Sequence, residues 1–302
     1  MRDFTDDHSA LALNTASLGH NLDGAGAGWS PERVIDACAA RGYGGIVFWR
    51  REIGSRAVEI GNRVRAAGMQ VVGLCRTPYL VGAEAPRNRD DLRASIDMAA
   101  DLGAPVLTIV TGGTEPGTKG VIETQKRLAE RLAEAAPLAN AAGVSLALEP
   151  LNPMFGGNRT CIFSVADALA VADEVAAPNV GIAVDVYHVW WDRTLAESLA
   201  AARGRVLGYH LCDWLENTRH MLLDRGMMGD GVADLVALAE DTHRFEARYL
   251  DGLVPSGERR ALPAGENPAV HPSTRRKEPH RQYPHKTSIV LPEDATYSFR
   301  TG

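Results

Sequence analysis

Short apolar runs alternate with helical patterns along most of the chain, with glycine, proline or asparagine between them. The runs that predict strands are residues 11–17, 45–49, 70–75, 106–111, 144–149, 180–186 and 206–212. The patterns that predict helices cover about residues 31–41, 55–67, 89–102, 119–142, 164–176 and 195–202. Each strand is apolar throughout rather than alternating, which is typical of a parallel sheet covered by helices.

Seven such strands fit either a closed barrel or a doubly wound open sheet. Ionisable residues at their carboxyl ends favour the barrel, so we predict an α/β protein with the (β/α)8 TIM barrel fold. We expect an irregular eighth strand, because the apolar run at residues 248–254 has Asp251 and Gly252 in its middle. The predicted domains are a catalytic TIM barrel over residues 1–254 and an irregular Pro- and Arg-rich tail over residues 255–302.

The composition is that of an ordinary globular enzyme, with 45% hydrophobic and 23% charged residues. The formal net charge of −6 argues against a nucleic acid partner, because binding to a phosphate backbone relies on a basic surface. Without a long apolar stretch or a signal peptide, we expect a cytoplasmic protein with no membrane partner. The four widely spaced cysteines are expected to be reduced and buried: Cys38, Cys75, Cys161 and Cys212.

Three consecutive predicted strands end in ionisable residues, namely Glu149, Asp185 and His210. The carboxyl ends of barrel strands lie on one face, so these side chains are expected to converge. A charge at the end of an apolar strand is costly to desolvate unless it is paired or metal-bound, so three together favour a metal site over separate salt bridges. Two carboxylates and an imidazole suit Mn²⁺, Mg²⁺, Co²⁺ or Zn²⁺. Asp213 either orients the imidazole of His210 or is an ordinary loop carboxylate.

Other residues near these strand ends each have two interpretations. His188 either hydrogen-bonds a substrate or fixes its own loop. Arg225, in the glycine-rich loop 224–231, suits an anionic or polyhydroxyl substrate, but is equally explained as a solvated arginine in a turn. Four tryptophans form either apolar walls for a sugar ring or ordinary packing: Trp49, Trp190, Trp191 and Trp214.

Taken together, these motifs resemble the sugar phosphate isomerase/epimerase superfamily, the xylose-isomerase-like barrels that also include proteins of the endonuclease IV type. Four runs within residues 9–240 carry the resemblance: LALEPLNP, VDVYH, GYHLCD and DRGMMGDG. The resemblance implies one divalent metal held by Glu149, Asp185, His210 and a second glutamate from strand eight. It also implies that His188 and Arg225 bind the substrate.

The activity implied by the resemblance is that of a metal-dependent isomerase or epimerase acting on a sugar or sugar-like polyol by proton transfer next to a carbonyl. In such enzymes two metal-bound glutamates exchange the proton on opposite faces of the substrate, and Glu149 is the catalytic one identified here. The metal stabilises the enediolate formed between the two steps. The resemblance also allows for a homo-oligomer, which no feature of the sequence decides.

The sequence departs from this pattern at strand eight, where no glutamate lies in an apolar run. Glu246, Asp251 and Glu258 are the nearest candidates for the fourth ligand. We hypothesise that a shift of reading frame replaced the C-terminus, which the other frames of the coding DNA would test.

Two alternatives to the isomerase stay open. One is a metal-dependent phosphodiesterase of the endonuclease IV type, although the sequence has few histidines for such a site. The other is a non-catalytic barrel with an incomplete metal site.

Overall fold

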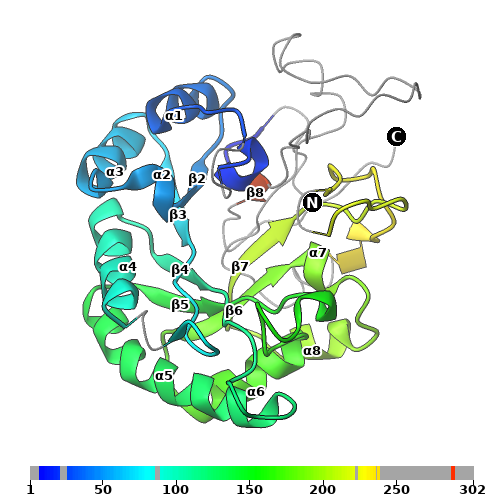
Figure 1. Cartoon of the computed structure of the whole chain (residues 1–302). Helices are drawn as coiled ribbons and strands as arrows, with labels where there is room; N and C mark the ends of the chain where they lie inside the picture. Colours follow the sequence, from blue (N-terminus) through cyan, green and yellow to red (C-terminus); the bar gives the residue numbers. More distant parts are fainter. Residues whose placement is uncertain are drawn as a thin grey trace, which may run out of the picture.

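The computed structural model of the chain describes residues 7–20, 26–85, 89–221, 224–235, 237–238 and the backbone of 287–289. Within these residues seven parallel strands follow one another around a barrel in the order of the sequence (Figure 1). They are β1 (Leu11–Asn14), β2 (Gly45–Trp49), β3 (Gln70–Cys75), β4 (Val106–Ile109), β5 (Ser145–Leu148), β6 (Val180–Asp185) and β7 (Val206–Leu211). The predicted barrel is confirmed.

Helices connect these strands and form a layer outside them (Figure 1). The longer ones are α1 (Pro31–Ala39), α3 (Ala57–Ala66), α4 (Arg89–Leu102), α5 (Ile122–Ala141), α6 (Val165–Val175) and α8 (Leu195–Ala201). Shorter helical turns follow several strands: η1 (Thr15–Leu18), α2 (Arg50–Ile53), η3 (Pro153–Phe155) and α7 (Val186–Val189). The largest apolar cluster fills the space between the strands and the helices, and its burial is the main source of stability.

Local signals in the sequence explain where these helices begin and end. Ser30 caps α1, its hydroxyl accepting the N–H of Arg33 at 3.3 Å, and Pro31 occupies the first turn. Ser164 and Asp167 form a reciprocal capping box at the start of α6. After α5, Gly143 adopts a φ of 71°, a left-handed conformation that ends the helix at little cost for glycine.

An eighth strand closes the barrel in an unpredicted way. β8 (Thr287–Ile289) is antiparallel and pairs with both β1 and β7. It comes from the range 255–302, for which the sequence predicted an irregular tail. The predicted eighth strand at residues 248–254 lies outside the described residues, and the division into two domains stays a prediction.

The barrel interior contains a layer of small side chains below its carboxyl end. Ala147 of β5 and Ala183 of β6 belong to one interior cluster, and Gly208 of β7 lies opposite Ala183 in the strand register. Side chains two positions apart in a strand share a face. The residues two positions further along therefore also point inward, above the small ones, and these are Glu149, Asp185 and His210.

Two further expectations concern the cysteines and membranes. All four cysteines are buried, and none forms a disulfide in the described part of the chain, as predicted. Burial raises the pKa of Cys38 to about 12 and that of Cys161 to about 11, so both stay protonated near neutral pH.

Among the residues that the structure describes, no helix is long and apolar enough to cross a membrane.

Candidate metal centre

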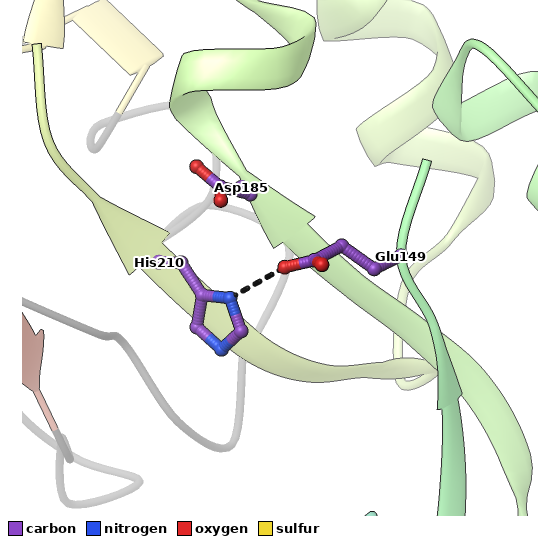
Figure 2. A group of neighbouring side chains, drawn as sticks. All are labelled: Glu149, Asp185 and His210. Atoms are coloured by element: carbon purple, nitrogen blue, oxygen red, sulfur yellow. Dashed lines mark hydrogen bonds and ion pairs between the residues drawn. The ribbon is translucent and has the colours of Figure 1, made fainter. Parts of the chain in front are cut away.

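Glu149, Asp185 and His210 converge at the barrel mouth. Figure 2 shows the carboxylate of Glu149 reaching towards the His210 ring on β7, with Asp185 at the end of β6. Each residue offers one ligand atom, and these atoms lie within 4.8 Å of one another. All three residues are buried, with exposed fractions of 5%, 0% and 3%.

The donor set fits a divalent metal ion. Metal–ligand distances of about 2.0–2.6 Å keep two ligands of one ion within roughly 5 Å of each other, a condition that the cluster meets. His210 Nδ1 lies 2.8 Å from Glu149 Oε1, so the two side chains hold each other in place. Among the described residues, this is the one group of three or more acidic, histidine or cysteine side chains close enough to hold an ion.

Asp185 is fixed by two further contacts. Its Oδ1 accepts the N–H of Tyr187 at 3.1 Å and so caps α7, while its Oδ2 accepts from Nη1 of Arg225 at 3.1 Å. Burial alone would lower the pKa of Arg225, but the nearby Asp185, Cys212 and Tyr187 outweigh it and the pKa is raised. The guanidinium is therefore a permanent positive charge beside this carboxylate.

Tyr187 forms a platform beneath Arg225. The guanidinium carbon lies 4.0 Å from the centre of the Tyr187 ring, which is a cation–π contact. The other side chain stacked on Tyr187 is Trp214, at 4.8 Å between ring centres. Burial raises the pKa of Tyr187 to about 12, and its hydroxyl donates to the Met221 carbonyl at 2.8 Å. Arg225 is thus held by aromatic packing as well as by Asp185.

His188 lies next to this pair and is 3% exposed. Its Nδ1 is 3.3 Å from the backbone N–H of Asn152, and its Nε2 is 3.2 Å from Nη2 of Arg225 and 3.8 Å from Asp185 Oδ2. The Asn152 N–H and the Arg225 guanidinium both donate, and a neutral imidazole accepts at one nitrogen only, so His188 accepts one of these two hydrogen bonds. The structure therefore brings His188 and Arg225 together with Asp185.

Comparison with known proteins identifies the family of this barrel. The family model described as xylose isomerase-like TIM barrel matches residues 35–247. The chain belongs to this family. Comparison with curated protein sequences found no match.

The chain is also similar to solved structures. Protein SMc04130 from Sinorhizobium meliloti 1021 is 37% identical with a TM-score of 0.71, over 78% of this chain and 85% of that one. IolI protein, described with a binding zinc atom, is 18% identical with a TM-score of 0.64, covering 78% and 85%. An L-ribulose 3-epimerase is 20% identical with a TM-score of 0.61, covering 78% and 77%. At identities of 18% and 20% the last two show the shared fold alone.

In this xylose isomerase-like barrel, Asp213 has a different role from the three candidate metal ligands. Its Oδ1 accepts the N–H groups of Trp214 and Ala233, at 2.8 and 3.1 Å. Its Oδ2 accepts those of Gly229 and Gly231, at 3.0 and 2.9 Å. Asp213 therefore anchors the loop that carries Arg225, which supports its interpretation as a loop carboxylate.

The tryptophans near the strand ends are packed to different extents. Trp190 lies 5.8 Å from Trp214 between ring centres, and Trp49 donates its Nε1–H to Asn14 at 3.0 Å. Trp191 is 38% exposed and donates to the His188 carbonyl at 2.7 Å. The predicted alternatives for the fourth ligand lie outside the described residues: Glu246, Asp251 and Glu258.

Sequence reasoning missed two residues that shape the site. Tyr187 supports Arg225, and the backbone of Asn152 positions His188. Both lie inside the runs that carry the family resemblance. Their position next to predicted ligands was a signal, but their contacts depend on the turns of α7 and η3, which strand patterns do not predict.

Proposed function

We propose that the chain is a divalent-metal-dependent isomerase or epimerase that acts on a sugar or sugar-like polyol by proton transfer next to a carbonyl. The observation that carries the proposal is the buried convergence of Glu149, Asp185 and His210 at the mouth of the barrel. Membership in the xylose isomerase-like family supports it, as does the shared fold with an L-ribulose 3-epimerase.

Glu149, Asp185 and His210 would hold the ion. Mn²⁺, Mg²⁺, Co²⁺ and Zn²⁺ all suit this set of ligands, and the zinc atom of the IolI structure supports a metal in a barrel of this fold. When bound, the ion supplies Lewis-acid stabilisation of negative charge on the substrate oxygen.

Side chains of the protein would accept the proton and bind the substrate. Glu149 is the proposed proton acceptor, since its carboxylate is buried at the mouth and oriented by His210. His188 and Arg225 bind substrate oxygens, because both are buried beside Asp185 and carry N–H groups. Their burial keeps bulk water from the carbon that exchanges its proton.

The test is proton exchange on a ketose. The full chain loaded with Mn²⁺ is incubated with L-ribulose in D₂O, and replacement of the C–H next to the carbonyl by deuterium is followed by NMR after the metal has been removed. We expect exchange that stops on chelation and recovers on adding Mn²⁺. Glu149→Gln should slow it by about 10²–10⁴-fold, the usual contribution of a general base.

Glu130→Gln on the exposed face of α5 is the matched control and should leave the rate unchanged. Metal affinity is measured for both variants, because Glu149 is also a proposed ligand. Undiminished exchange in metal-free protein would refute the proposal. If the metal-loaded chain instead hydrolyses bis(p-nitrophenyl) phosphate and exchanges no ketose, the phosphodiesterase alternative replaces it.

A further inference from the structure

A second polar cluster lies on the β1–β2 side of the barrel. It consists of Asn14 at the end of β1, Thr15 and His20 just after it, Trp49 at the end of β2, and Glu52 in α2. All five lie at or just after the carboxyl ends of parallel strands, so the cluster lies at the same end of the barrel as the metal centre.

Glu52 holds His20 in a defined orientation. Glu52 Oε2 is 2.6 Å from His20 Nδ1, while Oε1 accepts the Trp49 N–H at 2.7 Å and the Thr15 hydroxyl. A carboxylate accepts hydrogen bonds and does not donate them, so Nδ1 of His20 carries a proton. In the neutral imidazole the lone pair is then on Nε2.

Two buried nitrogens of this cluster have no hydrogen-bond partner in the described part of the chain. They are Nε2 of His20, a residue that is 8% exposed, and Nδ2 of Asn14, which is fully buried. Oδ1 of Asn14 accepts from Trp49 Nε1 at 3.0 Å and from the Ala16 N–H at 3.1 Å, so the amide nitrogen is the end left over. Buried polar atoms nearly always have a hydrogen-bond partner, so we interpret these two nitrogens as binding sites for a ligand.

The strand geometry directs Asn14 into the mouth. Ala12 belongs to an interior cluster with Val47, and Asn14 lies two positions after it on the same face of β1. Glu149 stands in the same relation to Ala147. In the closed strand order β1 lies across the barrel from β5, so Asn14 and Glu149 point into the same mouth from opposite sides.

We propose that Asn14 and His20 form a second binding point, which takes hydroxyl groups at the end of a polyol substrate remote from the metal. A hydroxyl oxygen accepts from the Asn14 amide, and a hydroxyl proton is donated to His20 Nε2. Glu52 is a positioning residue that sets the tautomer of His20. This inference rests on the proposed function for its ligand class, but its test is binding rather than turnover.

The test uses the full chain loaded with Mg²⁺, labelled with ¹⁵N-histidine, and xylitol as the probe. Xylitol should shift the Nε2 resonance of His20. His20→Gln and Asn14→Asp should each weaken xylitol binding about tenfold, the effect of one hydrogen bond. Asn14→Asp keeps the acceptor for Trp49 and Ala16 and replaces the N–H donor by a negatively charged oxygen. Mg²⁺ affinity should match the wild type in both variants, which shows that the barrel is folded.

His8→Gln is the matched control. His8 precedes β1, at the opposite end of the barrel, and contacts the Arg41 carbonyl at 2.9 Å. It should leave xylitol binding unchanged. Glu52→Gln should move the His20 proton from Nδ1 towards Nε2, a spectroscopic change that a loss of packing alone would not produce.

Xylitol binding that is equally tight in His20→Gln and Asn14→Asp overturns the inference, as does wild-type protein that binds no xylitol. Binding that depends on both residues, without proton exchange on L-ribulose, supports the binding point and refutes the proposed function. Proton exchange together with full xylitol affinity in both variants supports the proposed function and refutes the binding point.

Discussion

Replacing Asp213 by Asn should release the loop that carries Arg225 while leaving the metal centre intact. Each carboxylate oxygen of Asp213 accepts two backbone N–H groups, and the residue is fully buried. In the Asp213→Asn variant one of these oxygens becomes an NH₂ group. Two backbone donors then face another donor, whichever oxygen is replaced.

The size of the effect follows from these bonds. A hydrogen bond to a charged group contributes about 1.5–3 kcal/mol, so the two lost bonds amount to about 3–6 kcal/mol. Gly229 and Asp230 are exposed, so the freed amides can rehydrate when the loop shifts. We therefore expect the lower end, about 3 kcal/mol, or roughly a hundredfold in the local opening equilibrium.

The assay is native-state amide hydrogen exchange at Gly229 and Gly231. Exchange at these amides should accelerate in Asp213→Asn, while the amides of β5 and β6 keep their protection. Asp230→Asn makes the same change of charge on an exposed residue of the same loop, and should leave the exchange of Gly229 and Gly231 unchanged. The backbone of Gly231 lies close to that of Trp214, since a Cβ at Gly231 would lie 2.1 Å from the Trp214 carbonyl oxygen.

The competing role for Asp213 predicts a different result. If Asp213 oriented His210, its loss would weaken metal binding by about 10–100-fold, the usual effect of removing a group that supports a ligand. Unchanged loop exchange combined with such a loss of Mn²⁺ affinity would refute our reasoning. Isothermal titration with Mn²⁺ distinguishes the two.

Three further predictions follow from buried and paired charges. Arg225→Met leaves Asp185 uncompensated, so the metal-free Tm should fall by an amount equivalent to about 3–5 kcal/mol; Mn²⁺ should raise the Tm of the variant more than that of the wild type, and an equal rise would contradict this. Cys38 and Cys161 should react with iodoacetamide much more slowly in folded than in urea-unfolded protein, because burial raises their pKa values to about 12 and 11; equal labelling by mass spectrometry would refute it. The hydrogen bond from Arg56 lowers the pKa of Glu32 to about 2, so Glu32 stabilises the fold above its unfolded value of 4.5 and loses this as the pH falls through that window. Glu32→Gln should thus be slightly less stable in urea titrations at pH 7 but equal to the wild type near pH 2, and a difference that grows on acidification would be inconsistent with this.

The parallel strands were predictable because each is an apolar run bounded by turn residues. The predicted limits of β2 and β3 coincide with the structure, and those of α4 do so as well. β1 ends at Asn14, three residues early, because the Asn14 side chain accepts the Ala16 N–H and starts the η1 turn. β8 could not be predicted, since three residues of antiparallel pairing leave no apolar run to recognise.

The candidate site was predictable only where a strand end indicates it. Glu149, Asp185 and His210 follow apolar strands directly, and the barrel topology then brings them together. The same rule would have found Asn14 had the end of β1 been recognised. His20 and Glu52 lie in turns, and their pairing across 32 positions has no periodic signal in the sequence.

The two sides of the mouth differ in a way that would orient a polyol bound between them. The β5–β7 side carries two carboxylates and the Arg225 guanidinium, which suits an ion and a polarised carbonyl. The β1–β2 side offers an amide N–H and an imidazole, which suit uncharged hydroxyl groups. The carboxylate on this side, Glu52, is already engaged by His20 and the Trp49 N–H. Small residues below both sides, such as Ala12 and Ala183, leave space for these longer side chains to reach the axis. A polyol bound between the two sides would therefore place its carbonyl end at Glu149 and its hydroxyl end at Asn14.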